Sequence, residues 1–384
     1  MKVTHIITRL ILGGAQENTL HNVEDQHSIF HDDVSLLTGP AEGPEGSLIP
    51  RAQQGGFRLE IIPEMKRSIR PLNEWQAYRK LVSLLNEIKP DLVHTHSSKA
   101  GILGRYAARK LKIPVVHSIH GAAFHFGQPK LAYKTYVAAE KAVSGWTEKY
   151  ICVADAMRDA YLEEGISSMD KYVTIQSGFE VEPFLNPPRA RAEVRNEFGF
   201  EDKHVVVGKI ARLFHLKGHE FLITAAKDVV SKNPNVRFLF VGDGLLRQEF
   251  ETRIAESGLS EYFRFSGLVP TTEIPNLIHA MDIVAHTSQW EGLARVLPQG
   301  LISAKPVISY DVGGAREVIL PGKTGYLLPR DSVSELSQAI CELAEDEQLR
   351  NRLGETGRAM FTDIFRHETM TARIREVYQA VLNQ

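Results

Sequence analysis

The chain has few cysteines, almost no net charge and no long uninterrupted apolar run. No uncharged apolar stretch approaches the ~20 residues that span a bilayer, so any membrane contact is expected to be peripheral. His5 and Arg9 interrupt the apolar N-terminal run, and no small-residue cleavage site follows. This segment therefore predicts a first strand rather than a signal peptide.

The charge balance argues against a nucleic-acid partner. Lys+Arg number 45 and Asp+Glu 47, a formal net charge of -2, so the chain has no global basic field. The two cysteines, Cys152 and Cys341, lie far apart in apolar contexts, which is typical of small buried residues in a reducing compartment. We therefore expect a cytoplasmic protein without disulfides.

The length and strand pattern predict two α/β domains. A chain of 384 residues exceeds the size of one hydrophobic core. Short β-branched runs alternate with helical patterns such as 72–88, which indicates parallel sheets with crossover helices. The segment 179–200, with Pro187 and Pro188, breaks the pattern and predicts a linker. The strand and helix series then restarts, and amphipathic helices are predicted over 336–343 and 368–382.

Glycines and charged residues follow several predicted strands, where ligands gather in open α/β sheets. Gly13 and Gly14 follow the first strand and precede a predicted helix, whose free amides suit a phosphate; a tight turn is the alternative. In the second domain, Arg212 and Lys217 lie between a strand and a helix. Two cations there suit a diphosphate, whereas a solvated loop with incidental charges is the alternative.

Two further turns belong to this set. Gly242 and Gly244 follow the next strand. Glu291 and Gly292 follow the strand 281–290, and a helix is predicted to begin at 293. The amides of Leu293 and Ala294 would then face a ligand while the acid grips sugar hydroxyls; an N-cap glutamate is the alternative.

These segments together resemble one known family. GGAQENTL, HTHSSKAGILGR, HSIHGAAFH, IARLFHLKGHEFLI, FLFVGDGLL, FSGLVP and TSQWEGLARVLPQGLISAKPVISYDVGGAREVI occur in the order seen in glycosyltransferase family 4 and extend over nearly the whole chain. The resemblance implies the α/β GT-B fold, in which two Rossmann-like domains face each other across a cleft. It implies an N-terminal acceptor-side domain at 1–180, a C-terminal donor-side domain at 181–364 and a final helix at 365–384 that packs back on the first.

The family also implies a reaction. Its members transfer a sugar from a nucleotide-sugar donor with retention of configuration and without a bound metal or cofactor. A UDP-sugar is favoured as co-substrate on general grounds alone, and the acceptor is expected to be a glycan or a lipid-linked hydroxyl in cell-surface polysaccharide or glycolipid synthesis. Two alternatives stay open: a GT-B sugar-nucleotide epimerase and a non-catalytic nucleotide-sugar-binding protein.

The resemblance also implies roles for individual residues. Arg212 and Lys217 would neutralise the donor diphosphate, and Glu291, the first acid of the family's E-x7-E motif, would hold hydroxyls of the donor sugar. Gly13 and Gly14 match the family's glycine loop beside the donor phosphates and the acceptor. His120 matches a histidine that lies near the donor sugar, although a lone histidine at a strand end is more often structural.

The sequence departs from the family at several positions. Gln299 replaces the second acid of E-x7-E; an amide accepts with one oxygen only, so ribose binding is expected to be weakened or rearranged. Ala294 stands where proline is common, and the SGFE segment at 177–180 replaces the more frequent Asn-Gly-Val-Asp.

The sequence also contains two local clusters of histidines and of cations. His94, His96 and His125 lie near one predicted sheet edge, but no acid stands at ligand spacing, so no metal site is predicted. Between Lys99 and Lys149, nine cations at 99, 105, 109, 110, 112, 130, 134, 141 and 149 face two acids. Arg105, Arg109 and Lys112 are predicted to share a helical face, which suits peripheral contact with anionic lipid on the inner face of the membrane or is simply solvated.

Overall fold

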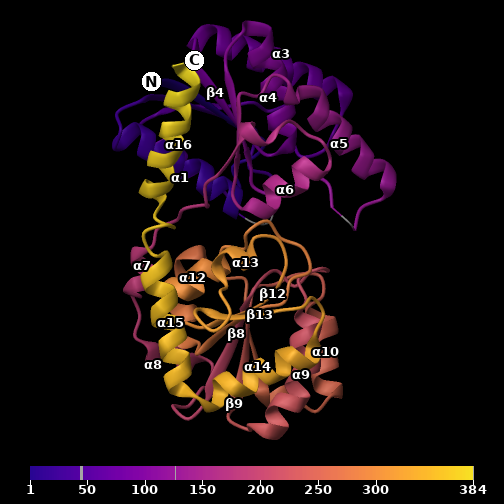
Figure 1. The fold of residues 1–384 in the computed structure, drawn as a ribbon, viewed down its shortest axis with the longest axis vertical. Helices are drawn as coiled ribbons and strands as arrows, with labels where there is room; N and C mark the ends of the chain where they lie inside the picture. The colour runs from indigo at the N-terminus through magenta and orange to yellow at the C-terminus, as the bar shows by residue number, and fades with distance from the viewer. Residues whose placement is uncertain (44–45, 126, 384) are drawn as a thin grey trace. The chain divides into compact units, whose positions relative to one another are not determined.

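The computed structural model describes residues 1–43, 46–125 and 127–383, which form two compact units (Figure 1). Unit 1 comprises Met1–Phe179 and Ile364–Gln384, and unit 2 comprises Glu180–Asp363. Among the described residues, no helix is long and apolar enough to cross a membrane. Cys152 is buried, and Cys341 is partly exposed.

Unit 1 is built on a seven-stranded parallel sheet in the order β3-β2-β1-β4-β5-β6-β7. Every residue of β4 and β5 is buried, as expected for strands with both faces covered. The strands are β1 (Lys2–Ile7), β2 (Asp33–Thr38), β3 (Arg58–Ile61), β4 (Leu92–His96), β5 (Val115–Ile119), β6 (Lys149–Cys152) and β7 (Tyr172–Thr174). The helices are α1 (Gly14–Ser28), α2 (Ile49–Gln54), α3 (Pro71–Ile88), α4 (Ser98–Leu111), α5 (Lys130–Ser144), α6 (Asp155–Glu163) and α16 (His367–Leu382), with a 3-10 turn η1 at Met169–Lys171.

Unit 2 repeats this design with six parallel strands in the order β10-β9-β8-β11-β12-β13. The strands are β8 (Val205–Ile210), β9 (Val236–Val241), β10 (Phe263–Gly267), β11 (Ile283–His286), β12 (Val307–Tyr310) and β13 (Gly325–Leu328). The helices are α7 (Glu182–Leu185), α8 (Arg191–Glu197), α9 (His219–Lys232), α10 (Arg247–Glu256), α11 (Ile274–Ala280), α12 (Val296–Ile302), α13 (Ala315–Val318), α14 (Val333–Glu345) and α15 (Glu347–Phe361), with 3-10 turns η2 at Ser260–Tyr262 and η3 at Thr271–Glu273.

Each sheet reverses its strand order once, between β1 and β4 in unit 1 and between β8 and β11 in unit 2. The predicted α/β class with two doubly wound Rossmann-like units is thus confirmed. At such a reversal the two neighbouring crossover helices lie on opposite faces, so the loops after the two strands open a crevice at their carboxyl ends. The reversal fixes where a ligand site forms in each unit.

The C-terminal helix α16 belongs to the core of unit 1, where it packs along α1 (Figure 1). Its buried Ile374 and Tyr378 share a hydrophobic cluster with Val3 of β1 and Leu92 of β4. Thr371 Oγ1 donates a hydrogen bond to Asp25 of α1 at 2.8 Å. The last helix therefore completes the sheet's covering layer.

The predicted linker at 179–200 was wrong in its extent, because α7 and α8 form within it and pack on α11 of unit 2. Arg195 explains the difference. Its buried guanidinium donates to Asp282 Oδ2 at 3.2 Å and to carbonyl oxygens of Glu201 and His204 at 2.7 Å each. These bonds tie the segment into unit 2, a role that charge pattern alone does not reveal.

Candidate functional site

In unit 2, the loops after β8 and β11 meet at the strand-order reversal. Lys217 precedes α9, and Glu291 follows β11. Lys217 Nζ lies 2.5 Å from Glu291 Oε1, which joins the predicted diphosphate cation to the predicted sugar-binding acid. Arg212 is exposed in the same loop as Lys217, with its guanidinium over the Phe214 ring. Two cations and one acid thus lie in the loops at the strand-order reversal of this unit.

The ionisation of Glu291 is set by its neighbours. Burial raises the pKa of a carboxyl, but here nearby His286 and Lys217 outweigh burial and lower the pKa of Glu291 to about 2. His286 Nε2 lies 3.8 Å from Glu291 Oε1, which is proximity rather than a hydrogen bond. Glu291 is therefore a carboxylate acceptor at every physiological pH.

Lys209 of β8 lies beneath this group and was missed by the sequence predictions. Its side chain is fully buried, and its Nζ has no hydrogen-bond partner among the residues the structure describes. Burial and the positive charge of Lys217 lower its pKa to about 7, against the opposing effect of Glu291. The missed signal was a lone lysine inside the apolar run VVVGKIA.

The glycines around this site serve close packing. At Gly218, φ is 71° and an added Cβ would lie 1.8 Å from Thr287 O, so only glycine joins the β8 loop to the residue after β11. At Gly242 and Gly244 an added Cβ would lie 2.3 Å from Ala211 O and 2.4 Å from Leu213 O. These glycines let the β9 turn approach the β8 loop that carries Arg212.

The predicted helix start at 293 was wrong, because α12 begins at Val296. Gly314 N donates to Gly292 O at 2.6 Å, and this bond holds the preceding loop against the β12–α13 turn. Leu293 and Ala294 consequently lie before the helix. Gln299 lies half-buried on α12.

In unit 1, the prediction that Gly13 and Gly14 directly follow the first strand was wrong. β1 ends at Ile7, and Gly14 is the first residue of α1. The intervening loop is held elsewhere, since Leu12 N donates to Gly46 O at 3.2 Å. The glycine pair nevertheless stands at the N-terminus of the helix after β1, beside the strand-order reversal.

His120 follows β5 and lines a pocket of about 270 Å³ together with Ala15, Ser97, Ser98, Gly121 and Tyr161. His120 Nε2 lies 3.1 Å from His96 Nδ1. Burial lowers the pKa of His120 to about 4, so its ring is neutral at pH 7. The pocket lies within unit 1.

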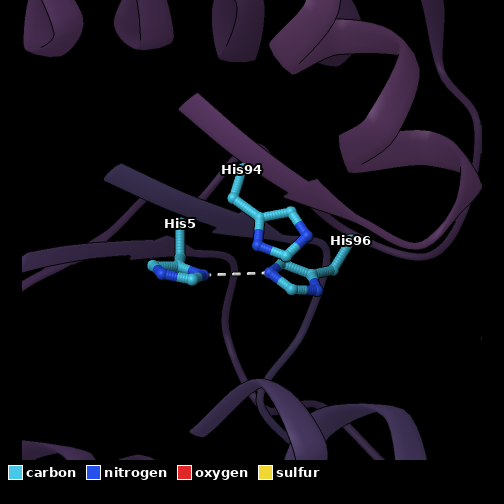
Figure 2. A group of neighbouring side chains, drawn as sticks. All are labelled: His5, His94 and His96. Carbon is cyan, nitrogen blue, oxygen red and sulfur yellow. Dashed lines mark hydrogen bonds between the residues drawn. The ribbon is translucent and has the colours of Figure 1, made fainter. Parts of the chain in front are cut away.

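The histidine cluster differs from the one considered in the sequence. His94 and His96 lie beside His5 of β1, and the ligand-type nitrogens of these three lie within 4.8 Å of one another (Figure 2). His125 instead lies in the loop before α5, where its Nδ1 accepts from Gly127 N at 3.2 Å. His5 was missed because the sequence alone does not show that β1 and β4 are neighbours.

The predicted basic face was wrong for Arg105, which is fully buried. Arg105 Nη2 donates to Glu140 Oε2 at 2.6 Å and its Nε donates to Gly101 O at 2.9 Å. Lys99 is also paired, with Glu74 at 2.6 Å. The remaining cations of α4, Arg109 and Lys110, line a separate pocket together with Lys112.

Two doubly wound parallel-sheet units, with Lys217 and Glu291 at the strand reversal of the second, are typical of the GT-B fold. Residues 26–182 match the family model described as Glycosyltransferase Family 4, and residues 190–360 match Glycosyl transferases group 1. The chain belongs to glycosyltransferase family 4, as its sequence motifs predicted.

Relatives extend over nearly the whole chain. The UDP-Gal:alpha-D-GlcNAc-diphosphoundecaprenol alpha-1,3-galactosyltransferase of Escherichia coli is 25% identical over 382 residues, 98% of this chain and 96% of that one. The putative glycosyltransferase EpsD of Bacillus subtilis is 28% identical over 318 residues, 80% and 82% of the two chains. The crystal structure of Anabaena Alr3699/HepE in complex with UDP has a TM-score of 0.84 at 24% identity, covering 99% of this chain and all of that one, and so shares the fold.

Proposed function

We propose that the protein is a retaining, metal-independent glycosyltransferase that moves a hexosyl group from a nucleotide-diphosphate sugar to an acceptor hydroxyl. The observation that carries this proposal is the Lys217–Glu291 pair at 2.5 Å, with Arg212 in the same loop. Cations suit a diphosphate and an ionised acid suits sugar hydroxyls. The domain containing them, predicted at 181–364, is assigned the donor, and the domain at 1–180 the acceptor.

The remaining site residues have supporting roles in this proposal. Gly242 and Gly244 shape the donor loop, and the backbone of Gly292, Leu293 and Ala294 lies beside the sugar. Gln299 contacts the ribose. In the first domain, Gly13 and Gly14 lie near the donor phosphates and the acceptor, and His120 contacts the donor sugar.

The proposed chemistry is same-face substitution. The acceptor hydroxyl oxygen forms a bond to C1 of the sugar while the bond from C1 to the diphosphate oxygen breaks, and the hydroxyl proton passes to the departing diphosphate. Within the described residues, no carboxylate is an obvious nucleophile for a mechanism through a covalent glycosyl-enzyme. Arg212 and Lys217 stabilise the charge that develops on the leaving group, so the protein acts mainly through electrostatic positioning.

The donor is proposed to be a UDP-sugar. A relative's name carries UDP-Gal, and structural neighbours were solved with UDP and with UDP-glucose. A thermal-shift panel of UDP, GDP and ADP with their sugars tests this choice, because a ligand at 100 times its Kd adds ~2.7 kcal/mol. A thermal shift with GDP or ADP but not with UDP would contradict the choice of a UDP-sugar.

Product analysis tests the reaction class. Incubation with the shifting donor and candidate acceptors, followed by mass spectrometry and NMR of the anomeric proton, is expected to show a transferred sugar with the donor's configuration. Epimerised nucleotide sugar without transfer would indicate the epimerase, and tight binding without turnover a binding protein. Activity is expected to survive EDTA; a strict Mg²⁺ or Mn²⁺ requirement would contradict the metal-free mechanism.

The acceptor is proposed to be a glycan or lipid-linked hydroxyl in cell-surface polysaccharide or glycolipid synthesis, used by a cytoplasmic enzyme that contacts the inner face of the membrane. The lipid-linked acceptor named for one relative supports this. Arg109, Lys110 and Lys112 line one pocket with the half-buried Trp146, an arrangement suited to an anionic interface. Sedimentation with vesicles containing anionic lipid, but not with neutral vesicles, is the expected result.

A further inference from the structure

A chain of hydrogen-bonded side chains extends from His120 into the interior of unit 1. His120 Nε2 lies 3.1 Å from His96 Nδ1. His96 Nε2 lies 3.0 Å from His5 Nδ1 (Figure 2). His5 Nε2 lies 3.1 Å from Gln26 Nε2 of α1. The side chains of His96, His5 and Gln26 are fully buried, so the hydrogen bonds that join them are made between protein groups.

All three rings are neutral at pH 7. Burial lowers the pKa of His5 and of His120 to about 4 and holds the pKa of His96 well below its ordinary value. A neutral imidazole has one donor nitrogen and one acceptor nitrogen. The tautomer of each ring therefore fixes the tautomer of the next.

The amide orientations of Gln26 and Asn22 together set the direction of the whole chain. Its amide nitrogen lies 3.1 Å from His5 Nε2 and donates to Asn22 Oδ1 at 2.8 Å. If it donates to His5 Nε2 as well, the proton of His5 lies on Nδ1 and points to His96. The reverse direction would place the amide oxygen of Gln26 against Asn22 Oδ1, acceptor against acceptor, unless Asn22 also turned.

The alternation of donor and acceptor nitrogens then continues from His5 through His96 to His120. His96 accepts from His5 at Nε2 and donates from Nδ1 to His120 Nε2, which leaves the proton of His120 on Nδ1. His120 Nδ1 has no hydrogen-bond partner within the part of the chain that the structure describes. His120 lines the pocket that also contains Ser97 and Tyr161.

We propose that Gln26, His5 and His96 are positioning residues that hold His120 in its Nδ1-protonated form, so that His120 is a neutral hydrogen-bond donor to an oxygen of the sugar substrate. The substrate contact rests on the proposed function, whereas the tautomer does not. His120 in this state does not act as a general base, in agreement with proton transfer to the departing diphosphate.

The tautomer is measured directly on the ligand-free protein. Long-range ¹⁵N–¹H NMR of histidine-labelled protein distinguishes the two neutral forms, and the loss of a signal in His120→Asn assigns that ring. Proton on Nδ1 of His120 is the expected result. Proton on Nε2, or a charged ring at pH 7, overturns the proposal.

Reversing the direction of the hydrogen bonds from Gln26 to His120 is the stronger test. In Gln26→Glu a carboxylate can only accept, so His5 is expected to donate from Nε2 and the proton of His120 to move to Nε2. Gln26→Leu removes the amide that bonds His5 and is expected to give a mixture of tautomers. This second variant tests the proposal if Gln26→Glu fails to fold. His94→Asn is the matched control, because His94 is a buried histidine of β4 bonded to Ser118 and Tyr378 instead. An unchanged His120 tautomer in both folded Gln26 variants contradicts the proposal.

Kinetics then tests the substrate contact. His120→Asn and Gln26→Glu are each expected to lower kcat/KM about five- to tenfold, the value of one hydrogen bond. The double variant is expected to be no slower than His120→Asn alone; additive losses contradict a shared route. A stoichiometric metal ion in the purified protein would also contradict the proposal, because coordination by His5 and His96 would replace the hydrogen bond between them. If no sugar transfer occurs at all, the proposed function fails while the tautomer result stands.

Discussion

At the scale of single residues, the pairing of Lys217 with Glu291 links charge neutralisation to sugar recognition. Both side chains are only partly exposed, so water screens the charges of the pair weakly. Each also restrains the other when no donor is bound. A change to either residue is therefore expected to affect both donor binding and the chemical step.

Lys217→Ala is expected to lower kcat/KM by an amount equivalent to ~2–4 kcal/mol, because developing charge on the leaving diphosphate loses a fixed cation. Steady-state kinetics with the identified donor measures this loss. Lys227→Ala removes an exposed lysine of α9 and is the matched control. Equal kcat/KM in Lys217→Ala and wild type would remove Lys217 from the diphosphate site.

Gln299→Glu is expected to retain or improve affinity for the nucleoside diphosphate, because a carboxylate accepts from both ribose hydroxyls. One charge-assisted hydrogen bond is worth ~1.5–3 kcal/mol, which repulsion from the diphosphate partly offsets. Calorimetric titration measures the balance, with Gln248→Glu on the exposed face of α10 as control. Binding more than about tenfold weaker in a folded variant would show that Gln299 does not contact the ribose.

At the scale of secondary-structure elements, strands and long helices were predictable and loops were not. The runs 72–88 and 368–382 are the helices α3 and α16 to within about one residue, since apolar spacing reports burial directly. The loops before α1 and α12 were misplaced, because bonds such as Gly314 N to Gly292 O join segments that are distant in sequence. Arg105 was assigned to a solvated face because its partner Glu140 lies on another helix.

The buried Lys209 in strand β8 makes the free energy of unfolding depend on pH. Its pKa falls from 10.5 to about 7, so between pH 7 and 10.5 the unfolded chain binds more protons and the free energy of unfolding rises with pH. Lys209→Met is expected to raise this free energy at pH 7 by about 1–3 kcal/mol and to flatten its increase up to pH 9.5. Urea unfolding at both pH values measures the effect; a destabilised variant with an unchanged pH slope would contradict it.

Helices α4 and α5 are joined by the fully buried pair Arg105–Glu140. Glu140→Gln leaves the Arg105 charge without its counter-ion, so it is expected to cost about 3–5 kcal/mol of unfolding free energy. Chemical denaturation measures this change. Glu148→Gln, at an exposed site, is the control and is expected to change stability by no more than about 0.5 kcal/mol.

At the scale of the whole molecule, the chain enters unit 2 and then returns to unit 1 for its last helix. The sequence motifs predicted the family and the two-unit α/β class, because strand and helix periodicity repeats on both sides of residue 180. They did not show which side chains meet at the strand reversals. His5 and Lys209 look like ordinary strand residues until β1 lies beside β4 and β8 beside β11.

The return of the chain makes the stability of unit 1 depend on α16. Met370, Ile374 and Tyr378 are almost fully buried, and each such side chain contributes roughly 1.5–3 kcal/mol, so together they approach the ~5–15 kcal/mol that a domain has in total. Tyr378 also lies 2.5 Å from His94 Nδ1 through its hydroxyl. Loss of α16 would therefore remove a large part of what holds β1 and β4 in place.

A chain ending at Asp363 is expected to keep unit 2 folded while unit 1 opens. Hydrogen exchange followed by mass spectrometry measures this, with peptides from β1 and β4 losing protection and peptides from β8 and β11 retaining it. A chain ending at Leu382 keeps all of α16 and is the control, with wild-type protection expected throughout. If β1 and β4 exchange as slowly in the shorter chain as in this control, α16 is an accessory to unit 1 rather than part of its core. If β8 and β11 lose protection as well, the two units do not fold independently.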